Sequence, residues 1–206
     1  MNYQDSRKLQ PGRLVVASHN QGKVKELKAL LGRYGMELVS SKELDLPEPD
    51  EIGTTFFFNA ELKAMTAADL SGFPAIADDS GICVEALDGR PGVYTANWAE
   101  TGNGRDWMLA MTKVEDALSL LGPEVSRAAY FACVLSVAWP DGHIESFEGR
   151  VDGTLVWPPR GDKGFGYDPM FVPLGYDQTF AEMDPEAKHA ISHRAAAFEK
   201  LKAALL

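Results

Sequence analysis

The sequence predicts an α/β fold, because short apolar runs typical of strands alternate with stretches in which apolar residues recur at helical spacing. The chain opens with an apolar run at residues 14–17, followed by a polar turn and a helix. Further along, two strand-like segments flank Pro140, Asp141 and Gly142, a turn that favours an antiparallel hairpin. A length of 206 residues suits one domain, and we expect residues 1–206 to form it.

The N-terminal half is expected to contribute three strands and two helices. We expect the strands at residues 14–17, 36–39 and 74–77. The first helix ends at Gly32, and its helical spacing is carried by Val24, Leu27, Leu30 and Leu31. An acidic loop that contains prolines, residues 44–53, leads to the second helix at residues 55–70. The third strand is expected to end abruptly at the polar sequence Asp78-Asp79-Ser80-Gly81.

The C-terminal half is expected to contain a hairpin between two helices. Helical spacing predicts the first of these helices over residues 105–121. The hairpin strands are expected at residues 127–139 and 143–151. The last helix is expected from about residue 192 to residue 206.

The charge distribution favours a small anionic ligand. The formal net charge is −10, yet Lys188, His193 and Arg194 form a short basic run near the last helix. A polyanion such as nucleic acid would meet repulsion over most of an acidic surface, whereas a small anion can bind at one place. We therefore expect a phosphate ester as ligand and no nucleic-acid partner. The alternative interpretation of the run is a solvated helix start.

Nothing in the sequence predicts membrane insertion or export. No apolar run reaches the ~20 residues needed to cross a bilayer, and the N-terminal residues lack the apolar segment of a signal peptide. Cys83 and Cys133 are far apart and have no nearby histidine, so they predict neither a zinc site nor a disulfide framework. We expect a cytoplasmic protein with reduced thiols and no membrane partner.

Two polar segments lie where strands are expected to end. Residues 18–23 begin the first helix, where free N–H groups and the helix dipole favour anions, and Lys23 adds a charge. A capping turn is the alternative, since the P-loop pattern is absent. Asp78 and Asp79 would repel each other unless a cation compensates them, and Mg²⁺ suits that role. The alternative is that one of them caps a turn ending in Gly81.

Two further segments suit a purine nucleotide. In residues 161–169, glycines flank Phe165, whose ring could stack on a base, while Asp168 offers acceptors for a base edge. A glycine-rich turn with its aromatic rings in the core is the alternative. In the basic run, Lys188 suits a phosphate and Arg194 can donate in a bidentate fork, while His193 could be a helix cap.

Five segments of the chain, in this order, resemble the Ham1-like inosine and xanthosine triphosphate pyrophosphatases: SHNQGKVKEL, GTTFFFNAELKA, ADDSGICVEALDGRPGVYTANWA, GFGYDPMFVP and EAKHAISHRAAA. The resemblance extends over residues 14–206. It implies a homodimeric α/β protein with a long, mixed, strongly twisted sheet flanked by helices, and two lobes with a central cleft. It also implies Mg²⁺-dependent hydrolysis of dITP, ITP or XTP to the monophosphate and pyrophosphate.

The resemblance also implies roles for individual residues. The triphosphate would be bound by Ser18, His19, Asn20, Gln21, Gly22 and Lys23. Asp79 would be the general base and a metal ligand together with Glu51, although Glu48 lies close enough in the sequence to compete. Ser80 would contact the substrate. The purine would be held by Phe165, Gly166, Tyr167 and Asp168, Lys188 would contact the substrate, and His193 with Arg194 would read the base.

One residue departs from the family pattern. Phe58 stands where the family has a glutamate before the Asn-Ala pair, which puts a carboxylate contribution from the second helix in doubt. Two alternatives to the inosine-type activity stay open at this point. One is a Maf-like pyrophosphatase that acts on pyrimidine or modified nucleotides, and the other is a module that binds nucleotides without hydrolysing them.

Overall fold

The computed structural model describes residues 7–206, in which the chain divides into two compact units. The first consists of the residues up to Asp79 together with Cys133–Gly149 and Ala197–Leu206, and the second of Ser80–Ala132 and Arg150–Ala196. No helix within residues 7–206 is long and apolar enough to span a bilayer.

A mixed sheet of six strands has the order β2-β1-β3-β6-β7-β8. Its members are β1 (Gly12–Val16), β2 (Met36–Ser40), β3 (Ala75–Val84), β6 (Ala128–Ala138), β7 (Ile144–Leu155) and β8 (Phe171–Pro173). Strand β1 pairs in parallel with β2 and β3, whereas β7 and β8 are antiparallel. The three longest strands, β3, β6 and β7, each contribute residues to both units. The α/β fold with a mixed sheet flanked by helices is thus confirmed.

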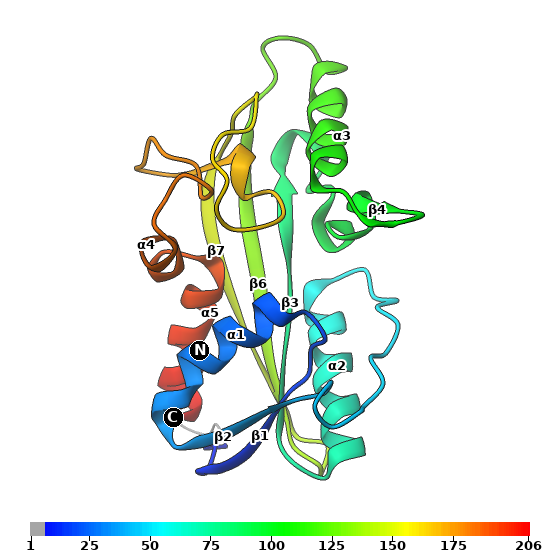
Figure 1. Ribbon diagram of the computed structural model, residues 1–206, viewed down its shortest axis with the longest axis vertical. Coiled ribbons are helices and arrows are strands. Elements are labelled where there is room, and N and C mark those ends of the chain that lie inside the picture. The colour runs from blue at the N-terminus through cyan, green and yellow to red at the C-terminus, as the bar shows by residue number, and fades with distance from the viewer. Residues whose placement is uncertain (1–6) are drawn as a thin grey trace. The chain divides into compact units, whose positions relative to one another are not determined.

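In the first unit, helices cover both faces of the parallel strands (Figure 1). Because side chains alternate along a strand, Leu14 and Val16 of β1 pack into one layer with α1 (Gln21–Leu31) and the C-terminal part of α5 (His193–Leu205). Val15 and Ala17 pack into the opposite layer with α2 (Phe56–Ser71). The α2 layer is built mainly from alanines: Ala64, Ala67, Ala68, Ala75, Ala77 and Ala138.

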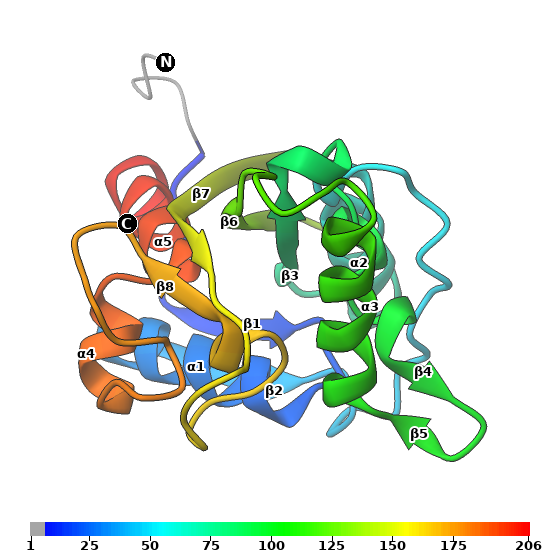
Figure 2. The same ribbon diagram turned by 90° about the horizontal axis from the view of Figure 1, so that it is seen from above.

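The second unit has an aromatic core. The ring of Phe131 on β6 meets Phe171 on β8 edge-on, with centroids 4.8 Å apart, and stacks on Phe180 at 6.0 Å. Helix α3 (Trp107–Ser119) contributes apolar residues to this core at helical spacing: Ala110, Met111, Val114 and Leu118. The short hairpin of β4 (Glu100–Thr101) and β5 (Gly104–Arg105) projects beyond α3 (Figure 2), and α4 (Pro185–Ala190) precedes α5.

The sequence prediction was wrong about the end of the third strand. Strand β3 does not stop before Asp78 but continues through the polar sequence to Val84. The reason is that Asp78 and Asp79 find partners inside the first unit, so the backbone does not have to turn toward solvent to hydrate them. The elements that the sequence did not predict, β4, β5, β8 and α4, are only two to six residues long.

Gly153 on β7 provides a test of the core of the second unit. A methyl group there would collide with the carbonyl oxygen of Val172 and the ring of Phe171, so Gly153→Ala should push β8 away from β7. We expect a loss of about 1–3 kcal/mol in the free energy of unfolding, as is typical of overpacking. Gly102→Ala is the matched control, because a methyl group there meets nothing within 4 Å. Equal urea unfolding midpoints for the two variants would contradict the packing described.

Candidate functional site

The first helix, α1, is capped at its N-terminus by a side chain of the preceding loop. Asn20 is the N-cap of α1, and its side-chain oxygen accepts from the N–H groups of Gly22 at 2.9 Å and Lys23 at 3.3 Å. The hydroxyl of Ser18 in turn accepts from the N–H of Asn20 at 3.1 Å. Asn20 therefore caps α1, and a phosphate would compete with its side chain for the N–H groups of Gly22 and Lys23.

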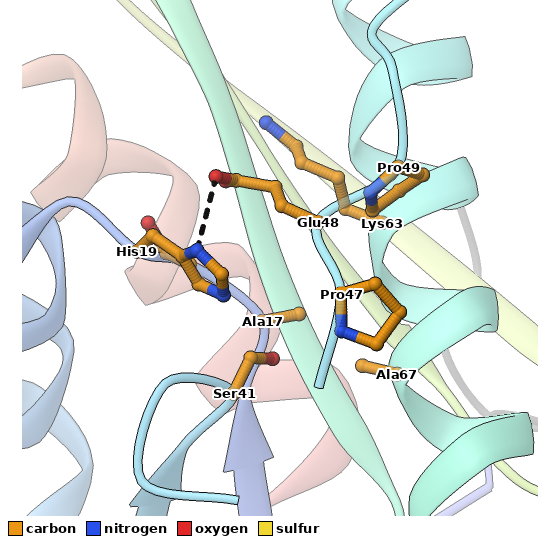
Figure 3. A pocket seen from close by; sticks show the side chains of 9 residues that line it. Ala17, His19, Ser41, Pro47, Glu48, Pro49, Lys63 and Ala67 are labelled. Atoms are coloured by element: carbon orange, nitrogen blue, oxygen red, sulfur yellow. Dashed lines mark ion pairs between the residues drawn. The ribbon is translucent and has the colours of Figure 1, made fainter. Parts of the chain in front are cut away.

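His19 is directed at the acidic loop, residues 44–53. Its Nε2 lies 3.1 Å from the carbonyl oxygen of Leu46, and its Nδ1 lies 3.6 Å from a carboxylate oxygen of Glu48. Figure 3 shows the ring facing Glu48 at a small pocket that Lys63 also lines. Gln21 and Gly22 are exposed at the start of α1. The side chain of His19 thus links the end of β1 to the acidic loop.

Lys23 makes an ion pair with Asp78. Its ammonium lies 2.6 Å from Oδ1 of Asp78, whose side chain is completely buried. The thiol of Cys133 lies 3.4 Å from the other oxygen of Asp78. Of the two adjacent carboxylates, Asp78 therefore anchors Lys23, and this leaves Asp79 as the candidate for chemistry.

Asp79 is held by two residues of α2. Lys63 places its ammonium 3.5 Å from Oδ1 of Asp79 and also makes a short ion pair with Glu51. The amide nitrogen of Asn59 donates to Oδ2 of Asp79 at 3.2 Å. Asp79 is only 5% exposed, and both helix residues are buried as well. The cluster therefore brings a carboxylate, an ammonium and an amide together largely out of water.

This environment shifts the ionisation of the cluster. Burial raises the pKa of Asp79 to about 6, and the charges of Lys63 and Lys23 only partly oppose that rise. Burial alone would lower the pKa of Lys63, but the nearby carboxylates, Asp79 first among them, outweigh it and the pKa is raised. Lys63 is therefore charged at neutral pH, and Asp79 can both accept and release a proton near that pH.

The donor set suits a hard cation with few protein ligands. Within residues 7–206, no three or more His, Cys, Asp or Glu side chains are grouped so that they could hold a metal ion. Mg²⁺ typically takes only one or two carboxylates and completes its shell with water and phosphate oxygens. Asp79 and Glu51 both pair with the ammonium of Lys63, so a metal ion bound by these two carboxylates would have to share them with that lysine. Glu48 is instead directed to His19.

In the second unit, Asp168 organises the glycine-rich segment. Its Oδ2 accepts from the N–H of Phe165 at 2.8 Å and from the ammonium of Lys188 at 2.5 Å. A methyl group on Gly164, which has a φ of +73°, would collide with the same oxygen. Lys188 also lies 5.0 Å from the centroid of the Phe165 ring, which is 41% exposed. Asp168 therefore holds Phe165 and Lys188 in place, and Phe165 keeps exposed surface for stacking.

Tyr167 lies inside the second unit. Its ring is buried edge-on against Trp107, and its hydroxyl donates to the carbonyl oxygen of Thr95 at 3.3 Å. Burial raises the pKa of its hydroxyl. The preceding Gly166 has a φ of +69°, which favours glycine. A substrate contact at Gly166 and Tyr167 would therefore involve their backbone, because the aromatic side chain belongs to the core.

The basic run is split between two helices. Lys188 belongs to α4, whereas His193 and Arg194 are the first residues of α5. His193 stacks on Phe131 with centroids 5.0 Å apart, and Arg194 donates to the hydroxyl of Ser80 at 3.2 Å. Arg194 is 3% exposed, so its guanidinium is held within the unit. The structure thus brings Arg194 to Ser80, and Lys188 to Phe165 and Asp168.

Asn59 and Lys63 were not predicted as site residues. They lie four positions apart on α2, on the same buried face as Ala60, Ala64 and Ala67. A lysine and an asparagine on an otherwise alanine-rich stripe are unusual, because buried polar groups need partners. This interruption of the apolar stripe is the signal in the sequence that could have identified them.

Comparisons with known proteins place this chain in one family. Residues 14–204 match the Ham1 family. A protein of Zymomonas mobilis named dITP/XTP pyrophosphatase is 58% identical over 200 residues, covering 97% of this chain and 95% of its own. One of Caulobacter vibrioides with the same name is 59% identical over 194 residues, covering 94% and 97%. The solved HAM1 protein of Coxiella burnetii superimposes with a TM-score of 0.86 at 36% identity, covering 93% and 96%. On these matches the chain belongs to the Ham1 family.

Proposed function

We propose that this protein hydrolyses dITP, XTP and ITP to the nucleoside monophosphate and pyrophosphate, with Mg²⁺ as cofactor, and so removes these purine nucleotides from the pool. The whole chain would act as one pyrophosphatase domain. Its relatives named dITP/XTP pyrophosphatase support the activity and the substrates. The match to the Ham1 family favours this function over the Maf-like alternative. The homodimer and the cytoplasmic location implied by the family resemblance form part of the same proposal.

The state of Asp79 is the observation that carries this proposal. A carboxylate that is buried beside Lys63 and receives a hydrogen bond from Asn59 is held in one direction and is suited to orient a water molecule and accept its proton. A module that only binds nucleotides would need Asp79 at most as a metal ligand and would not need it as a base. The geometry of Asp79 therefore favours hydrolysis over simple binding.

The reaction needs a nucleophile, charge compensation and a leaving group. Asp79 orients a water molecule and takes its proton as the water oxygen attacks the α-phosphorus. The bond from that phosphorus to the bridging oxygen breaks, and pyrophosphate leaves with the electron pair. Lys23 would turn from Asp78 toward the phosphates and offset their charge. Asp79 and Glu51 would hold Mg²⁺, which would supply further positive charge to offset that of the triphosphate.

Base choice would follow from hydrogen bonding in the second unit. Hypoxanthine and xanthine present a 6-keto acceptor, which suits the guanidinium of Arg194, while Phe165 offers a ring for stacking. Adenine presents a 6-amino donor and would leave a buried donor of the protein unpaired. Guanine shares the keto group, so its rejection must depend on the 2-position of the ring.

One assay tests the whole proposal. Phosphate release, coupled to inorganic pyrophosphatase in the presence of Mg²⁺, should be fast with dITP and XTP and slow with GTP, dTTP and dUTP. Omission of the coupling enzyme should abolish the phosphate signal, because the product is pyrophosphate. Formation of the nucleoside monophosphate, measured directly without the coupling enzyme, should need Mg²⁺. Preference for dTTP or dUTP would instead support the Maf-like alternative, and binding of dITP without turnover would support a binding module.

Replacing Asp79 by asparagine should nearly abolish hydrolysis of dITP. The change removes the general base, which typically contributes about 10²–10⁴-fold, and a candidate metal ligand. The measurement is kcat for dITP at saturating Mg²⁺, with circular dichroism to confirm the fold. Turnover close to that of the wild type would contradict the assignment of Asp79.

The same substitution should change how the stability of the metal-free protein depends on pH. The pKa of Asp79 is about 6 in the folded protein against 3.8 for the free side chain, so ionisation opposes folding. This contribution to stability is fully present below about pH 4 and is lost as the pH rises through 6. The asparagine side chain cannot ionise, but its introduction also removes the partner of Lys63, a loss that applies at pH 5 and at pH 8 alike. The stability of Asp79→Asn relative to the wild type should therefore be higher at pH 8 than at pH 5, by about 1 kcal/mol. Unfolding in EDTA at both pH values checks this, and a pH-independent difference would contradict it.

Arg194→Ala should reduce the preference for dITP over dATP. Removal of a donor to a buried acceptor costs about 1–3 kcal/mol, so kcat/KM for dITP should fall roughly 10- to 100-fold while that for dATP falls much less. Arg194→Lys is the matched control for charge, because lysine keeps the positive charge but lacks the bidentate donors of the guanidinium. An equal loss for both nucleotides would reassign Arg194 to phosphate binding.

Phe58 is positioned where a glutamate would also cap α2. It is the third residue of the helix, its N–H bonds to the hydroxyl of the N-cap Thr55 at 3.2 Å, and its ring is 49% exposed. A carboxylate there would therefore not be buried. Phe58→Glu completes a capping box and should raise the free energy of unfolding by roughly 0.5–1 kcal/mol.

Phe58→Gln separates capping from a metal contribution. Glutamine completes the capping box as well but carries no charge. If the absent glutamate supports Mg²⁺, then Phe58→Glu should lower the Mg²⁺ concentration for half-maximal hydrolysis of dITP and Phe58→Gln should not. Identical Mg²⁺ titrations for the two variants would show that the carboxylate has no part in metal binding.

A further inference from the structure

Asn59 uses both ends of its side-chain amide. Its oxygen accepts from the N–H of Gly53 at 2.9 Å, and its nitrogen donates to Oδ2 of Asp79 at 3.2 Å. The donor on Gly53 requires the amide oxygen, and the carboxylate requires the amide nitrogen, so the orientation of the amide is fixed. Asn59 is buried, and the helix cap is supplied by Thr55. Asn59 therefore serves a purpose other than capping α2.

Gly53, whose N–H donates to Asn59, belongs to the acidic loop and has to lie close to the Asn59 side chain. A methyl group on Gly53 would collide with the amide oxygen of Asn59 and with the ring of Phe58. The backbone of the acidic loop can approach Asn59 only because residue 53 has no side chain. Gly53 lies two positions after Glu51, the candidate metal ligand of that loop. One hydrogen-bonded chain therefore runs from the acidic loop through Asn59 to Asp79.

We propose that Asn59 is a positioning residue that couples the acidic loop to the carboxylate of Asp79, an inference that rests on the proposed pyrophosphatase function. When the loop is seated, Gly53 holds the amide of Asn59, and the amide holds Oδ2 of Asp79 in the direction needed to accept a proton. When the loop moves away, Asp79 keeps its ion pair with Lys63 but loses the donor that orients it. The base is thus fully oriented only while the loop that carries Glu51 is in place.

The experiment is a double-mutant cycle on the full-length enzyme with dITP and Mg²⁺. Asn59→Ala removes both hydrogen bonds, and Gly53→Ala displaces the loop without touching Asp79. We expect kcat to fall roughly a hundredfold for Asn59→Ala and about tenfold for Gly53→Ala, with little change in KM, because misplacement of a catalytic group affects the chemical step. Gly32→Ala is the control, because a methyl group there meets nothing within 4 Å.

The double variant decides whether the two residues act as one link. If they do, Gly53→Ala adds no further loss of kcat in the Asn59→Ala background. Losses that multiply, or a folded Asn59→Ala variant with wild-type kcat, would overturn the proposal. Thermal melts identify any variant that does not fold, and in that case Gly53→Ala alone still has to lower kcat without raising KM.

Hydrogen exchange separates this inference from the proposed function. If the wild type does not hydrolyse dITP, the proposed function fails, but the coupling can still be measured. Asn59→Ala should then accelerate amide exchange in residues 44–53 relative to the wild type, whereas Gly32→Ala should not. Unchanged exchange in the acidic loop would overturn the coupling whatever the activity.

Discussion

The contact between Lys63 and Asp79 is the interaction around which the candidate site of the first unit is arranged. A carboxylate and an ammonium can be buried together only if their remaining hydrogen-bonding capacity is satisfied, and here Asn59 and Glu51 supply the missing partners. The ionised state of Asp79 still costs the folded protein stability, as its raised pKa shows. Such a cost is typical of a functional site, where stability is exchanged for a reactive group.

The main elements of the fold could be predicted from the sequence, because their apolar residues follow a clear period. The expected helix at residues 105–121 corresponds to α3, and the expected hairpin to β6 and β7. The period does not reveal where a strand stops when its polar residues are compensated inside the protein, and β3 was therefore predicted too short. Strand β8 and helix α4 contain too few residues to establish any period.

The site could be predicted only in part, because a sequence gives residue types but not the direction of side chains. Lys23 and Asp79 were expected to have oppositely charged partners. In the structure Lys23 pairs with the buried Asp78, and Asp79 pairs with the buried Lys63. The role of His19 at the triphosphate stays a prediction; its ring is directed at Leu46 and Glu48. Lys63 was not predicted, although it interrupts the alanine-rich stripe of α2, because only the packing of α2 against β3 brings it to Asp79.

The alanine layer beneath α2 limits which substitutions this part of the core can accept. Methyl groups on both sides set the spacing between the helix and the strands, so that spacing is fixed by backbone and Cβ atoms and hardly at all by rotamers. A larger residue on either side would shift Lys63 and Asn59 together relative to Asp79. Substitution of these alanines is therefore restrained by the geometry of the site. The alanines determine the positions of Lys63 and Asn59 relative to Asp79.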